Sequence, residues 1–309
     1  MVHDSLEPSP EKPDGSPVVI IGNFDGVHAG HRTVIDDARR YGPVVAVTFT
    51  PHPLAVIRPE ACPKLLCSYE DRRELLLAAG VSRVVEVPFN REVSEWTPAE
   101  FVDRVLLPLR PARIVVGANF RFGHRAAGDP ALLAELGRGR FEVETLPLYA
   151  EAGHGDVSST AIRAAVAAGD VEGAAEMLGR PFRYTHTVVR GHQRGRELGF
   201  PTANLPVDPA RVAPADGIYA GWLTCVAEPG AVPLPAAISV GTNPTFDDVV
   251  ATVVEAHVLD RTDLDLYGVT VAVDFVARLR GNVRFDGLDA LMAQMADDVT
   301  RTREVLGLI

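Results

Sequence analysis

The chain has 309 residues, of which 47% are hydrophobic and 23% charged, and its formal net charge is −11 at pH 7. This length is sufficient for two domains with cores of their own. The negative charge argues against broad binding of nucleic acid or of an anionic membrane surface, but it allows anionic small substrates at a locally positive site. No apolar run approaches the ~18 residues that a membrane-spanning helix requires.

The N-terminal segment, residues 1–16, is polar and rich in proline and acidic residues, so we expect a flexible tail without a signal peptide. The three cysteines, Cys62, Cys67 and Cys225, form no even disulfide framework, and no histidine cluster accompanies the first two to make a zinc site. This cysteine content fits a reducing cytoplasm best.

A short apolar strand, Val18–Ile21, runs directly into a glycine-rich stretch, residues 22–31, with the sequence GNFDGVHAGH. Apolar residues at helical spacing follow it. The stretch therefore predicts a strand-to-helix crossing at the carboxyl edge of a parallel sheet, where ligands bind. The glycines, the helix N-terminus and the imidazoles of His28 and His31 together suit a polyphosphate. A glycine-rich turn with two solvated histidines is the alternative.

Strand and helix patterns alternate through the residues that follow. Thr97–Glu100 is a capping box with proline at the first helical position, which predicts a helix start. We expect a helix at Tyr69–Ala79 and strands at Val44–Phe49, Arg83–Val87, Arg113–Gly117 and Phe141–Leu146. This alternation predicts a parallel, right-handed α/β sheet.

Two further stretches lie where ligands would bind. The sequence GANFRFGHRAAGD, residues 117–129, directly follows a predicted strand. Its Arg121 and Arg125 can meet phosphates, while Phe120 and Phe122 could flank a planar ring or, for one of them, belong to the core.

The second stretch, residues 157–163 (VSSTAIR), predicts another helix start. Ser159 or Thr160 can cap the helix, and Arg163 follows one turn later, which makes a second anion cradle. A plain helix cap accounts for the serines equally well.

The pattern changes after a short helix at Val171–Leu178. Helical periodicity is absent until Leu288, and the β-rich runs that replace it predict a small antiparallel barrel with a terminal helix at Leu288–Leu306. These runs are Thr185–Arg190, Gly217–Val226, Ala236–Val240, Thr252–Asp260 and Thr270–Arg280. We therefore place a domain at 17–182 and another at 183–309.

A glycine-punctuated loop leads into the barrel, residues 191–204, and ends in the sequence GFPTAN. Loop amides next to glycines can wrap phosphates, and Arg194 and Arg196 add positive charge. Thr202 and Asn204 are oxygen donors of the kind that Mg²⁺ takes. The loop is not a Walker A motif, because the G-K-[ST] ending is absent, and an ordinary surface loop is the alternative.

Residues 22–31 resemble the signature of nucleotidyltransferases that transfer AMP or CMP from a nucleoside triphosphate. In its extended form, G-x-F-D-G-V-H-x-G-H, the motif is similar to that of the FAD synthetase module of bacterial bifunctional riboflavin kinase/FAD synthetases. Residues 117–123 and 157–163 are similar to further blocks of that module, in the same order. Residues 48–53 resemble another block, although Thr50 stands where the family usually has an acid.

For this first domain the resemblance implies that FMN phosphate attacks the α-phosphate of ATP and expels pyrophosphate. His28 and His31 would stabilise charge on the α- and β-phosphates, and Arg163 would hold the leaving pyrophosphate. Mg²⁺ would bridge the phosphates. The implied flavin contacts are Phe120 and Phe122, and the implied nucleotide contacts are Gly22, Phe24, Asp25, Gly30, Asn119, Ser159 and Thr160.

The second domain resembles the riboflavin kinases, whose signature is GFPTAN. The resemblance implies that Thr202 and Asn204 hold the metal and ATP. In residues 254–260, similar to the strand that bears the catalytic acid, Glu255 would deprotonate the ribityl 5′-hydroxyl for attack on the γ-phosphate. A solvent-facing glutamate is the alternative. Further nucleotide contacts would come from Gly191, Gly195 and Arg196.

This sequence also departs from the riboflavin kinase pattern. Asp247 follows the T-F pair where a glycine is common, Ala251–Val253 stands where an arginine is common, and His186 replaces a usual glycine.

We therefore predict a Rossmann-like α/β nucleotidyltransferase domain followed by a small antiparallel β-barrel riboflavin kinase domain with a C-terminal helix. The predicted function is a cytoplasmic bifunctional enzyme with two ATP–Mg²⁺ sites, which converts riboflavin to FMN and FMN to FAD. We expect only small-molecule partners, without nucleic acid or membrane, and self-association is left open. The alternatives are a paralogue that uses a flavin analogue or another nucleotide, and a flavin-binding regulatory protein with a decayed kinase half.

Overall fold

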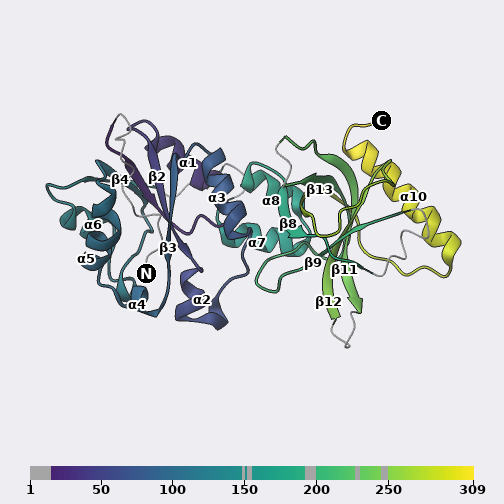
Figure 1. Cartoon of the computed structure of the whole chain (residues 1–309), viewed down its shortest axis with the longest axis horizontal. Coiled ribbons are helices and arrows are strands. Elements are labelled where there is room, and N and C mark those ends of the chain that lie inside the picture. Colours follow the sequence, from purple (N-terminus) through teal and green to yellow (C-terminus); the bar gives the residue numbers. More distant parts are fainter. Residues whose placement is uncertain (1–14, 148–149, 152–154, 192–199, 227–229, 245–249) are drawn as a thin grey trace. The chain divides into compact units, whose positions relative to one another are not determined.

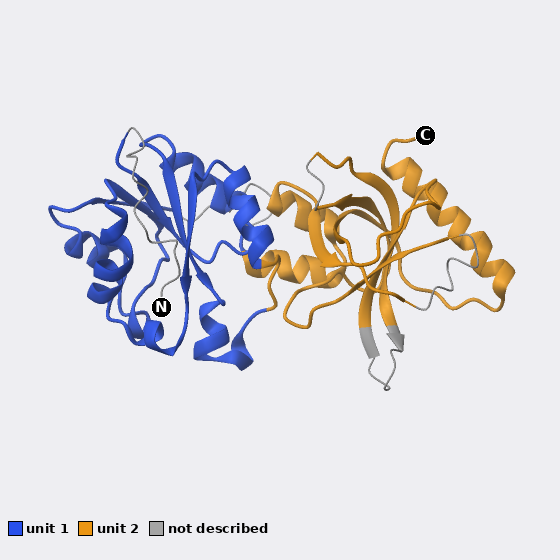
Figure 2. Cartoon of the chain, in the orientation of Figure 1, with its two compact units in different colours: residues 1–63, 69–158 blue, residues 64–68, 159–309 orange. Residues whose placement is uncertain are grey.

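The computed structural model of the chain describes residues 15–147, 150–151, 155–191, 200–226, 230–244 and 250–309 (Figure 1). Contacts divide the chain into two compact units (Figure 2). Unit 1 comprises residues 1–63 and 69–158, and unit 2 comprises residues 64–68 and 159–309.

Unit 1 is built on a parallel sheet of five strands in the order β3-β2-β1-β4-β5. The strands are β1 (Val18–Ile21), β2 (Val44–Thr50), β3 (Arg83–Pro88), β4 (Arg113–Gly117) and β5 (Glu142–Leu146). The strand order changes direction at β1, which pairs with both β2 and β4. Such a switch point opens a crevice at the carboxyl ends of the strands. The stretches that follow β1 and β4 therefore begin side by side at this edge.

Helices cover both faces of this sheet, as a parallel sheet requires. Val18 and Ile20 of β1 belong to one core cluster with α1 (Ala29–Ala38) and α3 (Tyr69–Ala78). Val19 and Ile21 belong to the opposite cluster, which contains residues of α5 and α6. The remaining elements of the unit are α2 (Pro53–Ile57), α4 (Arg91–Glu95), α5 (Pro98–Phe101), α6 (Pro130–Leu136), a π-helical turn (Val102–Leu106), 3-10 turns (Pro59–Ala61, Leu107–Leu109 and His124–Ala126), and the paired strands β6 (Ala150–Glu151) and β7 (Gly155–Asp156).

Unit 2 contains an antiparallel sheet of six strands in the order β8-β13-β10-β11-β12-β9. A bridge between Val189 and Asn204 brings the chain after β8 to β9, which nearly closes the sheet into a barrel. The strands are β8 (Phe182–Thr187), β9 (Ala203–Pro206), β10 (Gly217–Cys225), β11 (Leu234–Pro244), β12 (Val250–Val258) and β13 (Thr270–Arg280). The helices are α7 (Ser159–Ala168) and α8 (Val171–Leu178) before the barrel and α10 (Leu288–Val305) after it.

Contacts attach α7 and α8 to the barrel. The backbone N–H of Arg278 on β13 donates to Glu172 Oε1 on α8 at 3.1 Å. The Arg278 side chain donates from Nη1 to the carbonyl of Ala168, the last residue of α7, at 3.3 Å. Both helices therefore belong to the barrel unit, whereas the boundary of the functional domains at residue 182 stays a prediction.

The predicted fold class is confirmed, an α/β domain followed by an antiparallel barrel with a C-terminal helix. The strand predicted at 185–190 is shifted, because β8 pairs with β13 from Phe182 to Thr187. The loop predicted at residues 191–204 extends too far, because Ala203 and Asn204 already belong to β9. Residues 203–206 form a strand by pairing with β12.

Candidate active sites

The glycine-rich stretch after β1 forms a tight loop whose apolar residues anchor it in the core. Phe24 and Val27 are buried, and both adopt left-handed backbone with φ of 49° and 40°. The Val27 N–H donates to the Phe24 carbonyl at 3.1 Å, which closes the turn. Asp25 and Gly30 are also buried. The loop therefore places the N-terminus of α1 at the sheet edge, as predicted.

The two histidines of this loop lie against each other. The rings of His28 and His31 stack with centroids 3.7 Å apart, and Phe24 meets the His31 ring edge-on at 5.2 Å. Burial of the ring and the neighbouring His28 hold the pKa of His31 well below its ordinary value of 6.5. His31 is therefore neutral near pH 7 in the free protein, and a bound polyphosphate would raise its pKa.

The chain after β2 packs beside this loop. The buried Thr48 donates from Oγ1 to the Asn23 carbonyl at 3.3 Å. His52, also buried, accepts from the Leu54 N–H with Nδ1 at 3.2 Å and thereby caps α2. Its Nε2 lies 3.3 Å from the side-chain amide of Asn23. The two predicted motif blocks are thus in direct contact.

The two candidate flavin contacts in the stretch after β4, Phe120 and Phe122, have different environments. Phe122 is 6% exposed, and its ring packs between those of Phe101, at 5.8 Å, and Phe120, at 5.4 Å. A Cβ on Gly128 would lie 2.6 Å from the Phe122 ring, so Phe122 fills a closed place in the core. Phe120 is half-buried and Asn119 exposed, which leaves these two side chains accessible to a ligand.

The residues predicted to form the second anion cradle lie at the start of α7. Ser159 and Thr160 lie in the first turn of this helix, and Arg163 follows, half-buried. The contacts group all three with unit 2. That they act on the same nucleotide as His28 and His31 stays a prediction from the order of the motifs.

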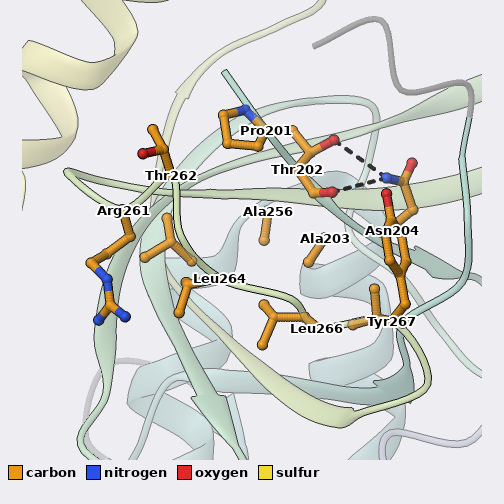
Figure 3. A pocket seen from close by; sticks show the side chains of 12 residues that line it. Pro201, Thr202, Ala203, Asn204, Ala256, Arg261, Thr262, Leu264, Leu266 and Tyr267 are labelled. Atoms are coloured by element: carbon orange, nitrogen blue, oxygen red, sulfur yellow. Dashed lines mark hydrogen bonds between the residues drawn. The ribbon is translucent and has the colours of Figure 1, made fainter. Parts of the chain in front are cut away.

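Unit 2 carries a pocket between β9, β12 and the segment that follows β12 (Figure 3). Thr202 and Asn204 lie together at one side of it, because Asn204 Nδ2 donates to the Thr202 carbonyl at 3.2 Å and to its Oγ1 at 3.3 Å. The lining residues are Val188, Pro201, Thr202, Ala203, Asn204, Ala256, Val258, Arg261, Thr262, Leu264, Leu266 and Tyr267.

Strand register brings Glu255 next to this pair. Glu255 on β12 lies directly opposite Asn204 on β9 and opposite Ser239 on β11. Directly opposed residues of antiparallel strands share a face of the sheet, with Cβ atoms about 5 Å apart. Glu255 is half-buried there.

Gly191 lies against the same asparagine. A Cβ on Gly191 would be 2.4 Å from Asn204 Oδ1 and 2.7 Å from its Cγ. Only glycine therefore lets the chain after β8 approach the Asn204 side chain this closely.

Two family models match the chain, riboflavin kinase over residues 178–306 and FAD synthetase over residues 11–161. A protein from Escherichia coli (strain K12), named bifunctional riboflavin kinase/FMN adenylyltransferase, is 36% identical over 305 residues and covers 96% of this chain and 95% of its own length. A protein of the same name from Listeria monocytogenes serovar 1/2a is 35% identical over 298 residues, with coverage of 94% and 92%. The chain belongs to this family.

A solved structure also matches both units of this bifunctional riboflavin kinase/FMN adenylyltransferase family member. It is described as a macrolide-efflux protein from Streptococcus pneumoniae, with a TM-score of 0.82 at 30% sequence identity and coverage of 94% of this chain and 95% of that one. Across the described residues, no helix has both the length and the apolar character needed to cross a membrane.

Gly195 and Arg196, two residues of the riboflavin kinase motifs, lie outside the described residues. So does Asp247, one of the departures from the family pattern. His186, another departure, is an ordinary β8 residue opposite Val271, with its ring parallel to that of Tyr184.

Two residues beside the candidate sites, His257 and Arg72, are not indicated by the sequence motifs. His257 stands two positions after Glu255 on β12, and its Nδ1 lies 2.9 Å from the Pro201 carbonyl. Arg72 of α3 contacts the loop after β1 and the end of β2. The even spacing from Glu255 could have indicated His257, whereas no local pattern indicates Arg72.

Proposed function

We infer that the chain catalyses two successive reactions: phosphorylation of riboflavin by ATP to FMN, and transfer of AMP from a second ATP to FMN, which yields FAD and pyrophosphate. One observation carries this proposal. The similarity to bifunctional relatives runs through both units, and the two family models match successive parts of the chain, residues 11–161 and 178–306.

For AMP transfer, we propose that unit 1 binds ATP at the loop after β1. An oxygen of the FMN phosphate attacks the α-phosphorus, and the bond to the pyrophosphate oxygen breaks. His28 and His31 would donate hydrogen bonds to the α- and β-phosphates, where negative charge moves during the reaction. The neutral state of His31 in the free protein means that it gains positive character only when the phosphates arrive.

The other proposed contacts bind the nucleotide, the flavin and the leaving pyrophosphate. Asn119 and the backbone of the loop would hold the nucleotide, and Phe120 would lie along the flavin. Arg163, Ser159 and Thr160 would hold the leaving pyrophosphate, because hydroxyls and a guanidinium at a helix start favour anions.

For riboflavin phosphorylation, we propose Glu255 as the general base. Its carboxylate takes the proton of the ribityl 5′-hydroxyl, the oxygen attacks the γ-phosphorus, and ADP leaves. The position of Glu255 opposite Asn204 supports this role, because the base then lies beside the residues proposed to hold the phosphates.

Mg²⁺ is the proposed metal at both sites. Thr202 and Asn204 would hold it in unit 2, because a hydroxyl and an amide carbonyl are oxygen donors of the kind that Mg²⁺ takes and the two side chains are neighbours. When bound, Mg²⁺ would neutralise negative charge on the phosphates of ATP. Within the described residues, no group of three His, Cys, Asp or Glu side chains could hold a metal ion.

We propose residues 17–182 as the adenylyltransferase domain and 183–309 as the kinase domain, with 1–16 a tail. The two family matches end at residue 161 and begin at residue 178, so α7 and α8 bridge the interval between them. The small, odd number of cysteines, three, supports a reducing, cytoplasmic setting.

Incubation of the full chain with riboflavin, ATP and Mg²⁺, with separation of the products over time, tests the proposal. We expect FMN first and FAD after it, with ADP and pyrophosphate as co-products. Turnover of riboflavin with a different nucleoside triphosphate in preference to ATP would favour the paralogue, and flavin binding without ATP consumption would favour the regulatory protein.

A further inference from the structure

The loop that carries His28 and His31 has an unfavourable backbone. Phe24 and Val27 have φ of 49° and 40°, a left-handed conformation that side chains bearing Cβ atoms disfavour and that β-branched valine disfavours most. Such backbone persists only where the surrounding contacts over-determine it. The residues that hold this loop from outside are therefore candidates for a functional role.

Arg72 holds the loop at its base. Its Nη1 donates to the carbonyl of Asn23, the residue before Phe24, at 3.1 Å. Its Nη2 donates to the Phe49 carbonyl at 3.0 Å and to Thr50 Oγ1 at 2.9 Å. One guanidinium, only 4% exposed, thus joins the loop after β1 to the end of β2.

The acceptors of Arg72 are themselves held. The Thr50 hydroxyl accepts from Arg72 and donates to Glu86 Oε2 on β3 at 3.1 Å, which connects the buried cation to a carboxylate through one hydroxyl. The Arg72 guanidinium also lies over the Tyr69 ring, with Cζ 4.9 Å from the centroid. The Tyr69 hydroxyl accepts from the His52 N–H at 3.0 Å, so the first turn of α3 fixes both loops.

His52 contacts the Asn23 side chain in turn. The His52 ring lies beside this side chain, with Nε2 3.3 Å from Asn23 Nδ2. Asn23 is therefore held at its carbonyl by Arg72, and its side chain contacts His52.

We propose that Arg72 is a positioning residue for AMP transfer: by holding the Asn23 carbonyl against the end of β2, it keeps the strained loop in the conformation that presents His28 and His31. The proposal rests on the function inferred for unit 1. A lysine cannot replace the arginine, because a single ammonium cannot present two nitrogen donors in the fixed fork that spans the loop after β1 and the end of β2.

The test compares Arg72→Lys with Arg73→Lys, a matched change at the next residue of α3, whose side chain is exposed. Both full-length variants are assayed for FAD formation from FMN, for riboflavin phosphorylation in unit 2, and for thermal unfolding. We expect Arg72→Lys to lower kcat for FAD formation about 100-fold, the scale of a misplaced catalytic group. We expect kinase activity within twofold of wild type, and Arg73→Lys should match wild type throughout.

A second pair of variants tests the same contact more gently. Thr50→Val removes the hydroxyl that accepts from Arg72 while keeping the side-chain shape, and Thr50→Ser keeps the hydroxyl. We expect Thr50→Val to lower kcat for FAD formation and Thr50→Ser to keep the wild-type kcat, with both variants assayed at a temperature at which each is fully folded.

Three results would overturn the inference. Arg72→Lys could retain the wild-type kcat for FAD formation, the two Thr50 variants could behave alike, or FAD formation could fall only in proportion to the fraction of unfolded protein. A wild-type chain that forms no FAD from FMN and ATP would instead overturn the function proposed for unit 1, and the inference with it.

Discussion

The substitution Gly191→Ala tests the proposed kinase site through a single methyl group. The added Cβ would lie 2.4 Å from Asn204 Oδ1, 2.7 Å from its Cγ and 3.0 Å from its Nδ2. Asn204 is largely buried and bonded to Thr202, so it cannot swing aside without losing those contacts. Overpacking of this kind costs about 1–3 kcal/mol. If the overpacking destabilises the transition state of riboflavin phosphorylation by about 2 kcal/mol, kcat/KM for this reaction falls about 30-fold.

The assay measures FMN formation from riboflavin and, separately, FAD formation from supplied FMN. We expect Gly191→Ala to lower only the first rate, because Gly191 contacts a residue of the kinase site. Gly281→Ala is the matched control, since a Cβ on Gly281 has no heavy atom within 4 Å. A Gly191→Ala protein that folds and phosphorylates riboflavin at the wild-type rate would refute the assignment of Asn204 to this site.

Three further predictions concern charge and packing. Because the pKa of His31 is depressed in the free protein and phosphates raise it, nucleotide binding near pH 6 should take up a proton. Calorimetry in two buffers of different ionisation enthalpy measures this uptake, which His31→Asn should reduce. The same depressed pKa means that the unfolded chain binds the extra proton, so stability falls as pH drops below about 6.5, by at most about 1.4 kcal/mol per pH unit. Equal pH dependence of unfolding in wild type and His31→Asn would contradict this. Phe122→Ala should destabilise the protein by about 3–5 kcal/mol, whereas Phe120→Ala should mainly raise KM for FMN; urea unfolding and initial rates separate the two effects. Asp298→Ala should cost about 3–5 kcal/mol, because it leaves the partly buried Arg280, bonded at 2.6 and 2.8 Å, without its carboxylate; an unfolding midpoint equal to that of wild type would show that the pair contributes little.

The elements that could be predicted from the sequence carry their pattern within themselves. Val18–Ile21 is a continuous apolar run, and Thr270–Arg280 alternates, so both strands occur with the predicted bounds. Ala203–Pro206 has neither pattern and ends in proline. It forms a strand only because it pairs with β12, and pairing with a distant segment gives no pattern in the local sequence.

The same distinction, between a local sequence pattern and contacts made only on folding, explains which site residues could be predicted. The motif residues of the loop after β1 could be named because glycines and histidines at that spacing carry chemical meaning. Arg72 lies in a run of charged residues, 70–74, that is typical of a solvated helix face. Its burial depends on loops that fold over α3. Phe120 and Phe122 are alike locally, and only the packing of Phe122 beside Phe101 and Gly128 separates them.

The central claim is that two chemically separate sites share this chain, and Glu255→Gln tests it most directly. Gln keeps the size of the side chain and removes the base. Supplied with FMN and ATP, this variant should form FAD at the wild-type rate; supplied with riboflavin and ATP, it should form neither FMN nor FAD. Loss of FAD formation from supplied FMN in a folded protein, or wild-type phosphorylation of riboflavin, would contradict the account.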